Sequence, residues 1–225
     1  MDELFDNTLK QIEKKIELEP IVLPEELKHI RLPMGMVDMH CYNWKAEKIR
    51  KIYFVRIKVT IPSFDIFGMA LYPEANLDIP SFACDFSCTR KKVFTYINFI
   101  PLFNEQSYLD KYIEPMKQMF DKHNNFPKRK IREWMQSYIS NYTIYTFSQK
   151  TMLKELKSCA IDYLTLYLEM FSQAEEIADT SCRDEVEKAQ NKYLHDLTTN
   201  DASRKMLGRI IGKERANRFF QEVVV

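Results

Sequence analysis

The chain has 225 residues, of which 45% are hydrophobic and 13% aromatic, a composition that excludes an intrinsically disordered protein. Its length suffices for one domain with a sizeable core, and we expect a single domain over residues 1–225. The 33 basic and 32 acidic residues leave a formal net charge of +1, so no global field draws the protein to nucleic acid or to a membrane surface.

The first half of the chain predicts a helix followed by a series of strands. Apolar residues at helical spacing indicate a helix over residues 2–18, which Pro20 ends, and Pro24 begins a second, short helix. Alternation and apolar runs then predict five strands, at residues 34–44, 50–61, 64–72, 79–88 and 92–100. Because the turns between them are short, we expect a largely antiparallel sheet.

Beyond Pro101 the pattern is mainly helical. The predicted helices cover residues 105–122, with a kink or break at Pro115, then 127–134, 152–178 and 182–197. A last strand is predicted at residues 142–147. Thr199 and Asn200 are predicted to cap a helix that begins near Asp201 and ends by Gly208 or Gly212. We therefore predict an α+β fold, an α/β/α sandwich with helices on both faces of a central sheet.

Cysteine and histidine usage argues against a disulfide framework or a metal centre. The five cysteines include no Cys-x-x-Cys pair, and the four histidines form no metal-binding motif, so we expect reduced thiols and no bound metal. The N-terminus is charged from Asp2 onward, and no apolar run reaches 18 residues. We expect a cytoplasmic protein, or one of the plastid stroma if a transit peptide has been removed.

Asp85 is the candidate for chemistry that the residues themselves single out. It is the one ionisable residue inside the apolar run 79–88, and alternation puts it on the small, polar face of that strand with Ala83 and Ser87. A carboxylate there must pair with a cation, face a ligand or take up a proton. Two interpretations stay open: a structural acid paired with an arginine, or a proton donor whose pKa burial has raised toward neutrality.

Three segments in order carry a family resemblance. The central one consists of Tyr72-Pro73-Glu74, Asp78-Ile79-Pro80, Phe82 and Asp85-Phe86. The C-terminal one runs from Asn200-Asp201 through Arg204 and Leu207 to Gly212-Lys213-Glu214 and Ala216, and a weaker one is Ile49-Arg50-Lys51. Together they resemble the ferredoxin-dependent bilin reductases, and the matched order extends over roughly residues 18–225.

The resemblance implies a ferredoxin-dependent oxidoreductase that reduces biliverdin IXα, a linear tetrapyrrole, to a phycobilin. In that family electrons arrive singly from reduced [2Fe-2S] ferredoxin, and the protein supplies protons to a bound radical without flavin, nicotinamide or metal. It implies that Asp85 is the principal proton donor and that Asp201, which by itself suits the first turn of a helix, is the second, from the opposite side of the pigment. We expect a monomer.

Further residues are candidates for binding the substrate. The resemblance places Gly68 and Asn200 beside the pigment, and Arg204 could either hold a propionate or pair with Asp201. Phe82 is aromatic enough to contact the pigment, although a role in the core suits it better. Arg50 and Lys58 are further propionate candidates at the rim of the sheet.

The chain departs from the family pattern at three positions. Gly68 stands where other members have His, Asn or Asp, and glycine inside a strand indicates close approach of a neighbour. Val55 replaces a glutamate of the phycocyanobilin-forming members, and Phe147 replaces an arginine. These changes favour a minimal mechanism resting on Asp85 and leave room for an unusual product.

Two alternatives remain at this point. The substrate could be 15,16-dihydrobiliverdin, or the protein could be a non-catalytic tetrapyrrole carrier that keeps the fold, as the loss of a polar residue at Gly68 suggests. The basic runs 90–92 and 128–132 read as solvated turns or as a docking face for an acidic electron carrier. Nucleic-acid binding is disfavoured because no aromatics interleave with these runs.

Overall fold

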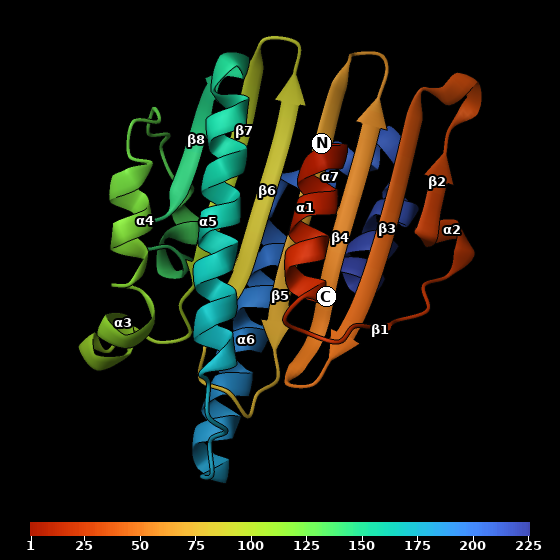
Figure 1. Cartoon of the computed structure of the whole chain (residues 1–225). Coiled ribbons are helices and arrows are strands. Elements are labelled where there is room, and N and C mark those ends of the chain that lie inside the picture. Colours follow the sequence, from red (N-terminus) through yellow and green to blue (C-terminus); the bar gives the residue numbers. More distant parts are fainter.

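The chain folds into a sheet with helices on both sides. The structure is a computed structural model and describes all of residues 1–225. Eight antiparallel strands form one sheet in the order β1-β3-β4-β5-β6-β7-β8, with β2 also paired to β3. Helices cover both faces of the sheet (Figure 1), so the predicted α+β sandwich is confirmed. No helix is long and apolar enough to cross a membrane.

The strands of the central meander follow one another through short turns, as the alternation predicted. Their bounds are β1 (Glu19–Pro20), β2 (His29–Arg31), β3 (Val37–Ala46), β4 (Ile49–Val59), β5 (Phe64–Pro73), β6 (Ser81–Thr89), β7 (Lys92–Ile100) and β8 (Ile144–Gln149).

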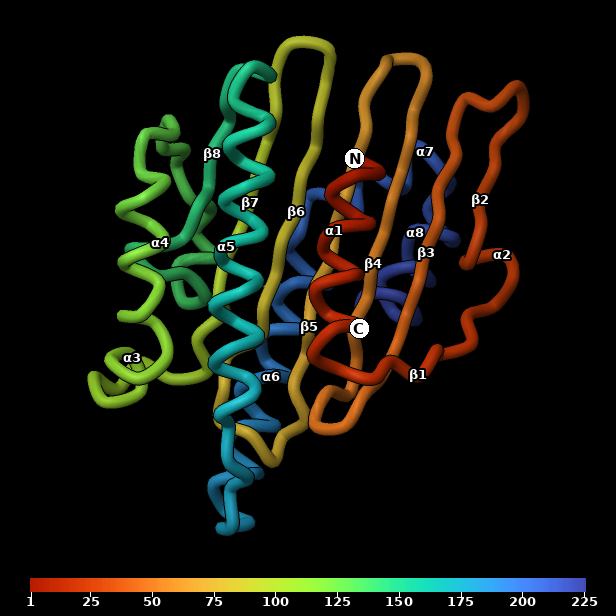
Figure 2. The backbone as a smooth tube through the Cα atoms, viewed as in Figure 1, coloured from red at the N-terminus to blue at the C-terminus, as the bar shows by residue number.

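The helices form one layer on each side of the sheet. One face is covered by α1 (Asp2–Glu13) and α5 (Leu153–Ser172). The other is covered by α6 (Thr180–Asn200), α7 (Ala202–Ile211), α8 (Lys213–Arg218) and a terminal π-helical turn, Phe219–Val224 (Figures 1 and 2). The short helices α3 (Gln106–Tyr112) and α4 (Met116–Lys122) lie beyond β8, and α2 (Glu25–Lys28) lies beside β2.

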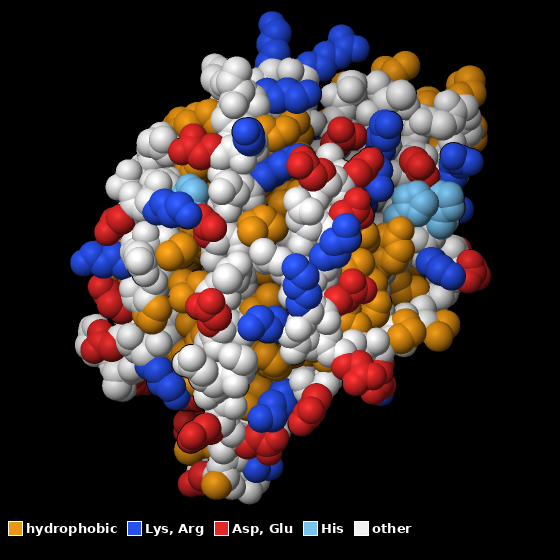
Figure 3. Space-filling model, in the orientation of Figure 1, with side chains coloured by type: hydrophobic (Ala, Val, Ile, Leu, Met, Phe, Trp, Pro, Cys, Tyr) orange, Lys and Arg blue, Asp and Glu red, His pale blue; other side chains and the backbone are white.

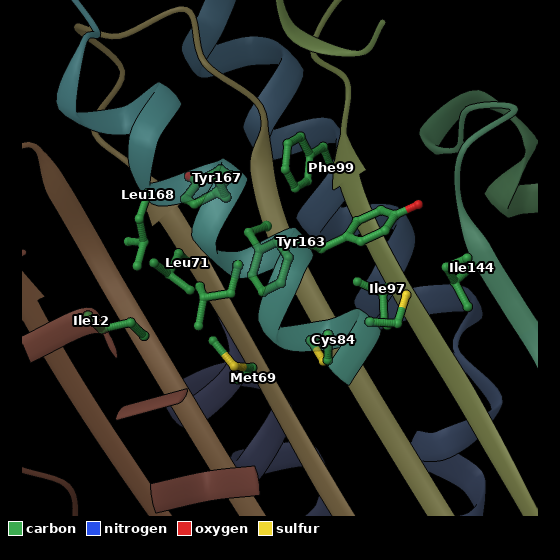
Figure 4. Close-up of a cluster of buried hydrophobic side chains, with 14 of the residues drawn as sticks. Ile12, Met69, Leu71, Cys84, Ile97, Phe99, Ile144, Tyr163, Tyr167 and Leu168 are labelled. Atoms are coloured by element: carbon green, nitrogen blue, oxygen red, sulfur yellow. The ribbon is translucent and has the colours of Figure 1, made fainter. Parts of the chain in front are cut away.

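Each face of the sheet has its own hydrophobic core, because the central strands are apolar at both alternating sets of positions. On the α1 and α5 side, Phe82 and Phe99 pack against Tyr167 with ring centroids 5.4–5.9 Å apart. Figure 4 shows this core, with tyrosines of α5 lying over the strands. On the other side the sheet presents smaller or polar-tipped residues such as Ala83 and Tyr96.

Three predicted elements differ from the structure. The first helix ends at Glu13 because the chain then turns to join the sheet edge as β1. Residues 127–132 are extended, not helical, because Lys128 forms a bridge with Thr146 of the edge strand β8, and a 3-10 helix follows at Glu133–Tyr138. The helix predicted to reach residue 178 ends at Ser172.

Pro115 splits the helix predicted over residues 105–122, as expected, and caps α4. The helix predicted near Asp201 is α7, which ends at Gly212, whose φ of 92° is accessible to glycine at little cost. Its N-cap is Asp201, not Thr199 or Asn200, because α6 extends through these two residues.

Phe82→Leu should lower the free energy of unfolding by about 1 kcal/mol, because the smaller side chain leaves a gap among fully buried rings. Urea denaturation measures it, and Val22→Ala, at a side chain that is 93% exposed, is the matched control. Equal stability of both variants would contradict the assignment of Phe82 to the core.

Candidate active site

Strand register brings one row of residues into line across the sheet on the α6 and α7 side. Val55, Gly68, Asp85, Tyr96 and Tyr145 are successive cross-strand partners on β4, β5, β6, β7 and β8. A cavity of about 380 Å³ covers most of this row, within the size range of small-molecule sites.

The opposite wall of the cavity comes from segments distant in sequence. It is built by the end of α6, the start of α7, the π-helical C-terminal turn and the loop after residue 128. Apolar and aromatic side chains dominate the lining, among them Tyr53, Ile57, Phe94, Tyr96, Trp134, Tyr145, Tyr193, Leu207, Phe219 and Phe220. A flat, conjugated ligand with few charges in its interior would match such walls.

Asp85 lies in this cavity without a partner in the chain. Burial raises the pKa of its carboxyl from 3.8 to about 7, and the charge of Asp201 adds to the rise. No arginine or other donor offsets these effects. Asp85 is therefore not a structural acid held in an ion pair. At neutral pH a large share of Asp85 is protonated and able to donate.

Gly68 explains how the Asp85 carboxyl group is accommodated. The two residues are cross-strand partners, and a Cβ atom at Gly68 would lie 2.7 Å from Oδ1 of Asp85 and 3.0 Å from Cγ1 of Val55. The carboxyl group therefore leans over β5 into the space that a side chain would fill. This is the close approach that glycine inside the strand predicted, and the neighbour is Asp85 itself.

Asp201 lines the cavity from the helical side, facing the sheet. It ends α6 and is the N-cap of α7, and its Oδ1 accepts a hydrogen bond from the backbone N–H of Ser203. The residue thus has the structural role that its position at a helix start indicates, and it also contributes a second carboxylate to the cavity.

Three of the predicted binding residues lie elsewhere. Phe82 points to the opposite core, because it alternates with Asp85 along β6. Asn200 is exposed, and its Nδ2 donates to the carbonyl oxygen of Asp196, 3.0 Å away. Arg204 donates to Asn217 and to the carbonyl oxygen of Thr198, so it ties α7 to α6 and α8 and neither pairs with Asp201 nor reaches the cavity.

The two rim candidates do not line the cavity either. Lys58 is exposed on the α1 face, because it alternates with Ile57. The Arg50 guanidinium lies 5.4 Å from the ring centre of Tyr72, and two of its nitrogens are buried without hydrogen bonds.

Two arginines that the sequence placed in a solvated turn line the cavity instead. Arg129 follows the bridge to β8, and its guanidinium lies over the rings of Phe94, Tyr145 and Phe147 at 5.4–5.8 Å. Arg132 follows three residues later in the same extended segment and also lines the cavity. Both are exposed and neither has a carboxylate within salt-bridge distance, so both are free to bind an anionic group of a ligand. Only the pairing of this segment with β8, which hydropathy does not reveal, puts them there.

Two histidines on the face of the sheet away from the cavity form a cluster that no sequence motif indicated. His29 and His40 are cross-strand partners, and the Nε2 atom of each lies near Oδ1 of Asp38, at 2.7 and 3.2 Å. Figure 3 shows histidines gathered at the edge by β2 and β3. The two rings are stacked 4.1 Å apart at 17°. Their Nε2 atoms and Oδ1 of Asp38 all lie within 4.8 Å of one another, a spacing that could hold a metal ion and that no histidine motif of the sequence indicated.

Asp85→Asn should make the protein more stable at neutral pH. Between about pH 4 and pH 7 the unfolded chain ionises Asp85 while the native state keeps its proton, so native stability falls as pH rises through this range. The variant lacks this loss, and its advantage should grow from near zero at pH 4 to at most about 4 kcal/mol above pH 7. Urea denaturation across this range measures it, with the exposed Asp6→Asn as control. A pH-independent difference would contradict the raised pKa.

Comparison with known proteins agrees with the geometry. The model of the family described as ferredoxin-dependent bilin reductase matches residues 5–224. The 15,16-dihydrobiliverdin:ferredoxin oxidoreductase of Nostoc punctiforme is 28% identical over 95% of this chain and 89% of its own length. The chloroplastic phytochromobilin:ferredoxin oxidoreductase of Arabidopsis thaliana is 25% identical over 98% of this chain and 68% of its own length.

The fold is shared with a solved member of this group. The crystal structure of phytochromobilin synthase from tomato in complex with biliverdin superposes with a TM-score of 0.90, covering 97% of this chain and 80% of that one at 20% identity. The match of the family model over almost the whole length shows that this chain belongs to the ferredoxin-dependent bilin reductases, which are oxidoreductases of linear tetrapyrroles.

Proposed function

We propose that this bilin reductase binds biliverdin IXα in the cavity between the sheet and α7 and reduces it to a phycobilin with electrons from ferredoxin. The observation that carries the proposal is the position of Asp85, a carboxyl group with a pKa of about 7 in an aromatic-lined cavity, facing Asp201 on the opposite wall. A reductase that receives only electrons from its partner must supply the protons from its own residues, and this pair can do so from the two faces of a flat pigment.

The chemistry balances with these groups. Reducing one carbon–carbon double bond adds two electrons, one from each of two reduced ferredoxin molecules, and two protons. Asp85 would deliver the first proton to the one-electron-reduced pigment, and Asp201 would contribute the second. Both would recover protons from solvent, since the cavity opens to the surface.

Arg129 and Arg132 would hold the carboxylates of the pigment. Biliverdin carries two propionates on an otherwise apolar conjugated frame, and the cavity carries these two unpaired cations beside aromatic walls. A guanidinium binds a carboxylate through two parallel hydrogen bonds, so the pair would also set the depth at which the pigment lies. In this chain Arg129 reaches over Phe147, the position at which the sequence lacks the arginine of several family members.

The names of the relatives favour biliverdin over dihydrobiliverdin as the substrate. A name of this form gives the electron donor first and the electron acceptor second. In the name of the Nostoc punctiforme protein the donor is 15,16-dihydrobiliverdin, which is therefore the reduced form of its pigment. The tomato protein was crystallised with biliverdin. Reduction of 15,16-dihydrobiliverdin by this chain remains the second candidate, and a non-catalytic carrier is the third.

Asp85→Asn should abolish most turnover and leave binding intact, because the amide keeps the shape of the carboxyl group and cannot donate the proton. We expect the rate to fall at least about 100-fold and the affinity for biliverdin to stay unchanged. The assay is an anaerobic absorbance time course with biliverdin IXα, ferredoxin, its reductase and NADPH, in which the biliverdin band gives way to a blue-shifted product.

The same assay separates the candidates. Full turnover by Asp85→Asn would remove this residue from its role. If biliverdin bound to the unaltered protein and its spectrum stayed constant, 15,16-dihydrobiliverdin would be supplied next, and a second unchanged spectrum would identify a carrier.

Arg129→Gln should weaken biliverdin binding about tenfold, because one charge-assisted contact to a propionate is lost. Fluorescence quenching titrations measure the affinity. Biliverdin dimethyl ester, which has no carboxylate charge, should bind the variant and the unaltered protein equally. Arg90→Gln, in the turn between β6 and β7, is the matched control, and an ester affinity that falls together with that of the acid would contradict the role of Arg129.

A further inference from the structure

Asn98 and Tyr96 form a buried polar unit that the proposed proton donors do not use. They are two residues apart on β7, so both project to the cavity side of the sheet. Asn98 is fully buried, and its Nδ2 donates to the Tyr96 hydroxyl oxygen at 3.1 Å and to the backbone carbonyl oxygen of Tyr138 at 2.6 Å.

The orientation of the Asn98 amide follows from its other partners. A carbonyl oxygen can only accept, so the atom facing Tyr138 must be the amide nitrogen. On the other side, Oδ1 accepts from the Thr143 hydroxyl at 2.6 Å, and that hydroxyl is already bonded by the N–H of Ser140 at 2.9 Å. Both amide hydrogens are therefore committed, one of them to Tyr96.

This arrangement decides where the Tyr96 hydrogen goes. Because Asn98 donates to the phenol oxygen, the phenol cannot return its own hydrogen to Asn98, and no oxygen of the chain accepts that hydrogen. Burial raises the pKa of Tyr96, and the charges of Asp85 and Asp201 add to this effect against the opposing hydrogen bond from Asn98, so the phenol stays protonated. Because Tyr96 lines the cavity, its hydroxyl hydrogen is free to bond to a ligand there.

Tyr96 also lies beside the main proton donor. It is the cross-strand partner of Asp85, which puts their Cβ atoms about 5 Å apart on the same face. The Tyr145 ring meets the Tyr96 ring edge-on, with centroids 6.1 Å apart at 84°, and limits its movement.

We propose that Tyr96 is a catalytic residue whose hydroxyl donates a hydrogen bond to a lactam carbonyl oxygen of the bound tetrapyrrole, and that Asn98 is the positioning residue that aims it. This rests on the proposed function. When the pigment takes up an electron, negative charge grows on its conjugated carbonyl oxygens, and a donor already in place stabilises that charge. The hydroxyl would therefore assist electron uptake, while Asp85 supplies the proton.

Tyr96→Phe tests the proposal, because it removes the hydroxyl and keeps the ring. Resonance Raman spectra of bound biliverdin should show a lactam C=O stretch at higher frequency in the variant, since the hydrogen bond is gone. The value of kcat should fall roughly 10- to 100-fold, with KM nearly unchanged. Tyr163→Phe is the matched control: it removes a buried hydroxyl that donates to the Tyr142 carbonyl oxygen on the opposite face, so it should change neither quantity.

A double-mutant cycle tests the role of Asn98. Asn98→Ala should lower kcat in the unaltered protein and have no further effect in the Tyr96→Phe background, because its influence passes through the hydroxyl. An unchanged C=O stretch and an unchanged kcat in Tyr96→Phe, in a preparation that reduces biliverdin, would overturn this proposal alone. Absence of any bilin turnover by the unaltered protein would overturn the proposed function and this inference with it.

Discussion

A carboxyl group placed against an apolar wall destabilises a protein unless a cation or several donors compensate it. Asp85 has neither, and it stays neutral for much of the time instead, because its pKa is about 7. The surroundings keep cations away. Its cross-strand neighbours are Gly68 and Tyr96, and Arg129 lies over the rings of Phe94 and Tyr145 on β7 and β8. The cross-strand neighbours of Asp85 thus leave its carboxyl group without a compensating charge.

The two-sided sheet is what makes such a row possible. The face toward α1 and α5 is filled by large rings, and Phe82, Phe99 and Tyr167 pack edge to face there among fully buried side chains. The opposite face is covered by three helices and a C-terminal turn that meet the sheet less closely and leave a cavity of about 380 Å³. One face stabilises the fold and leaves the other free to hold a ligand, with its acids on facing walls.

The acidic and basic side chains of the cavity lie in different parts of its lining. Acids lie at its sheet and helix walls, where the proposed function needs proton donors, and Arg129 and Arg132 lie on the exposed 127–132 segment. A dianionic pigment entering with its propionates outward would meet complementary charge at the mouth and proton donors inside. Tyr96 adds a neutral donor between these two zones, and Asn98 holds it without introducing another charge.

The sequence by itself determined the fold class and the family, and it singled out Asp85 as a candidate. Strand alternation is a local property, and so is the presence of a lone acid inside an apolar run, which is why the antiparallel meander and the side of β6 that carries Asp85 were both predictable. Pro115 and Gly212 mark helix boundaries through backbone constraints that also act locally.

Tertiary structure alone decided which other residues share the site. Asn200 and Arg204 are next to Asp201 in sequence, yet helix geometry turns them to solvent or to α8. The side of Phe82, by contrast, follows already from its odd spacing from Asp85 along the strand. Arg129 reaches the cavity because its segment pairs with β8, and Tyr96 is aligned with Asp85 by register. Pairing and register depend on contacts between residues far apart in the chain, and a single sequence carries no local signal for them.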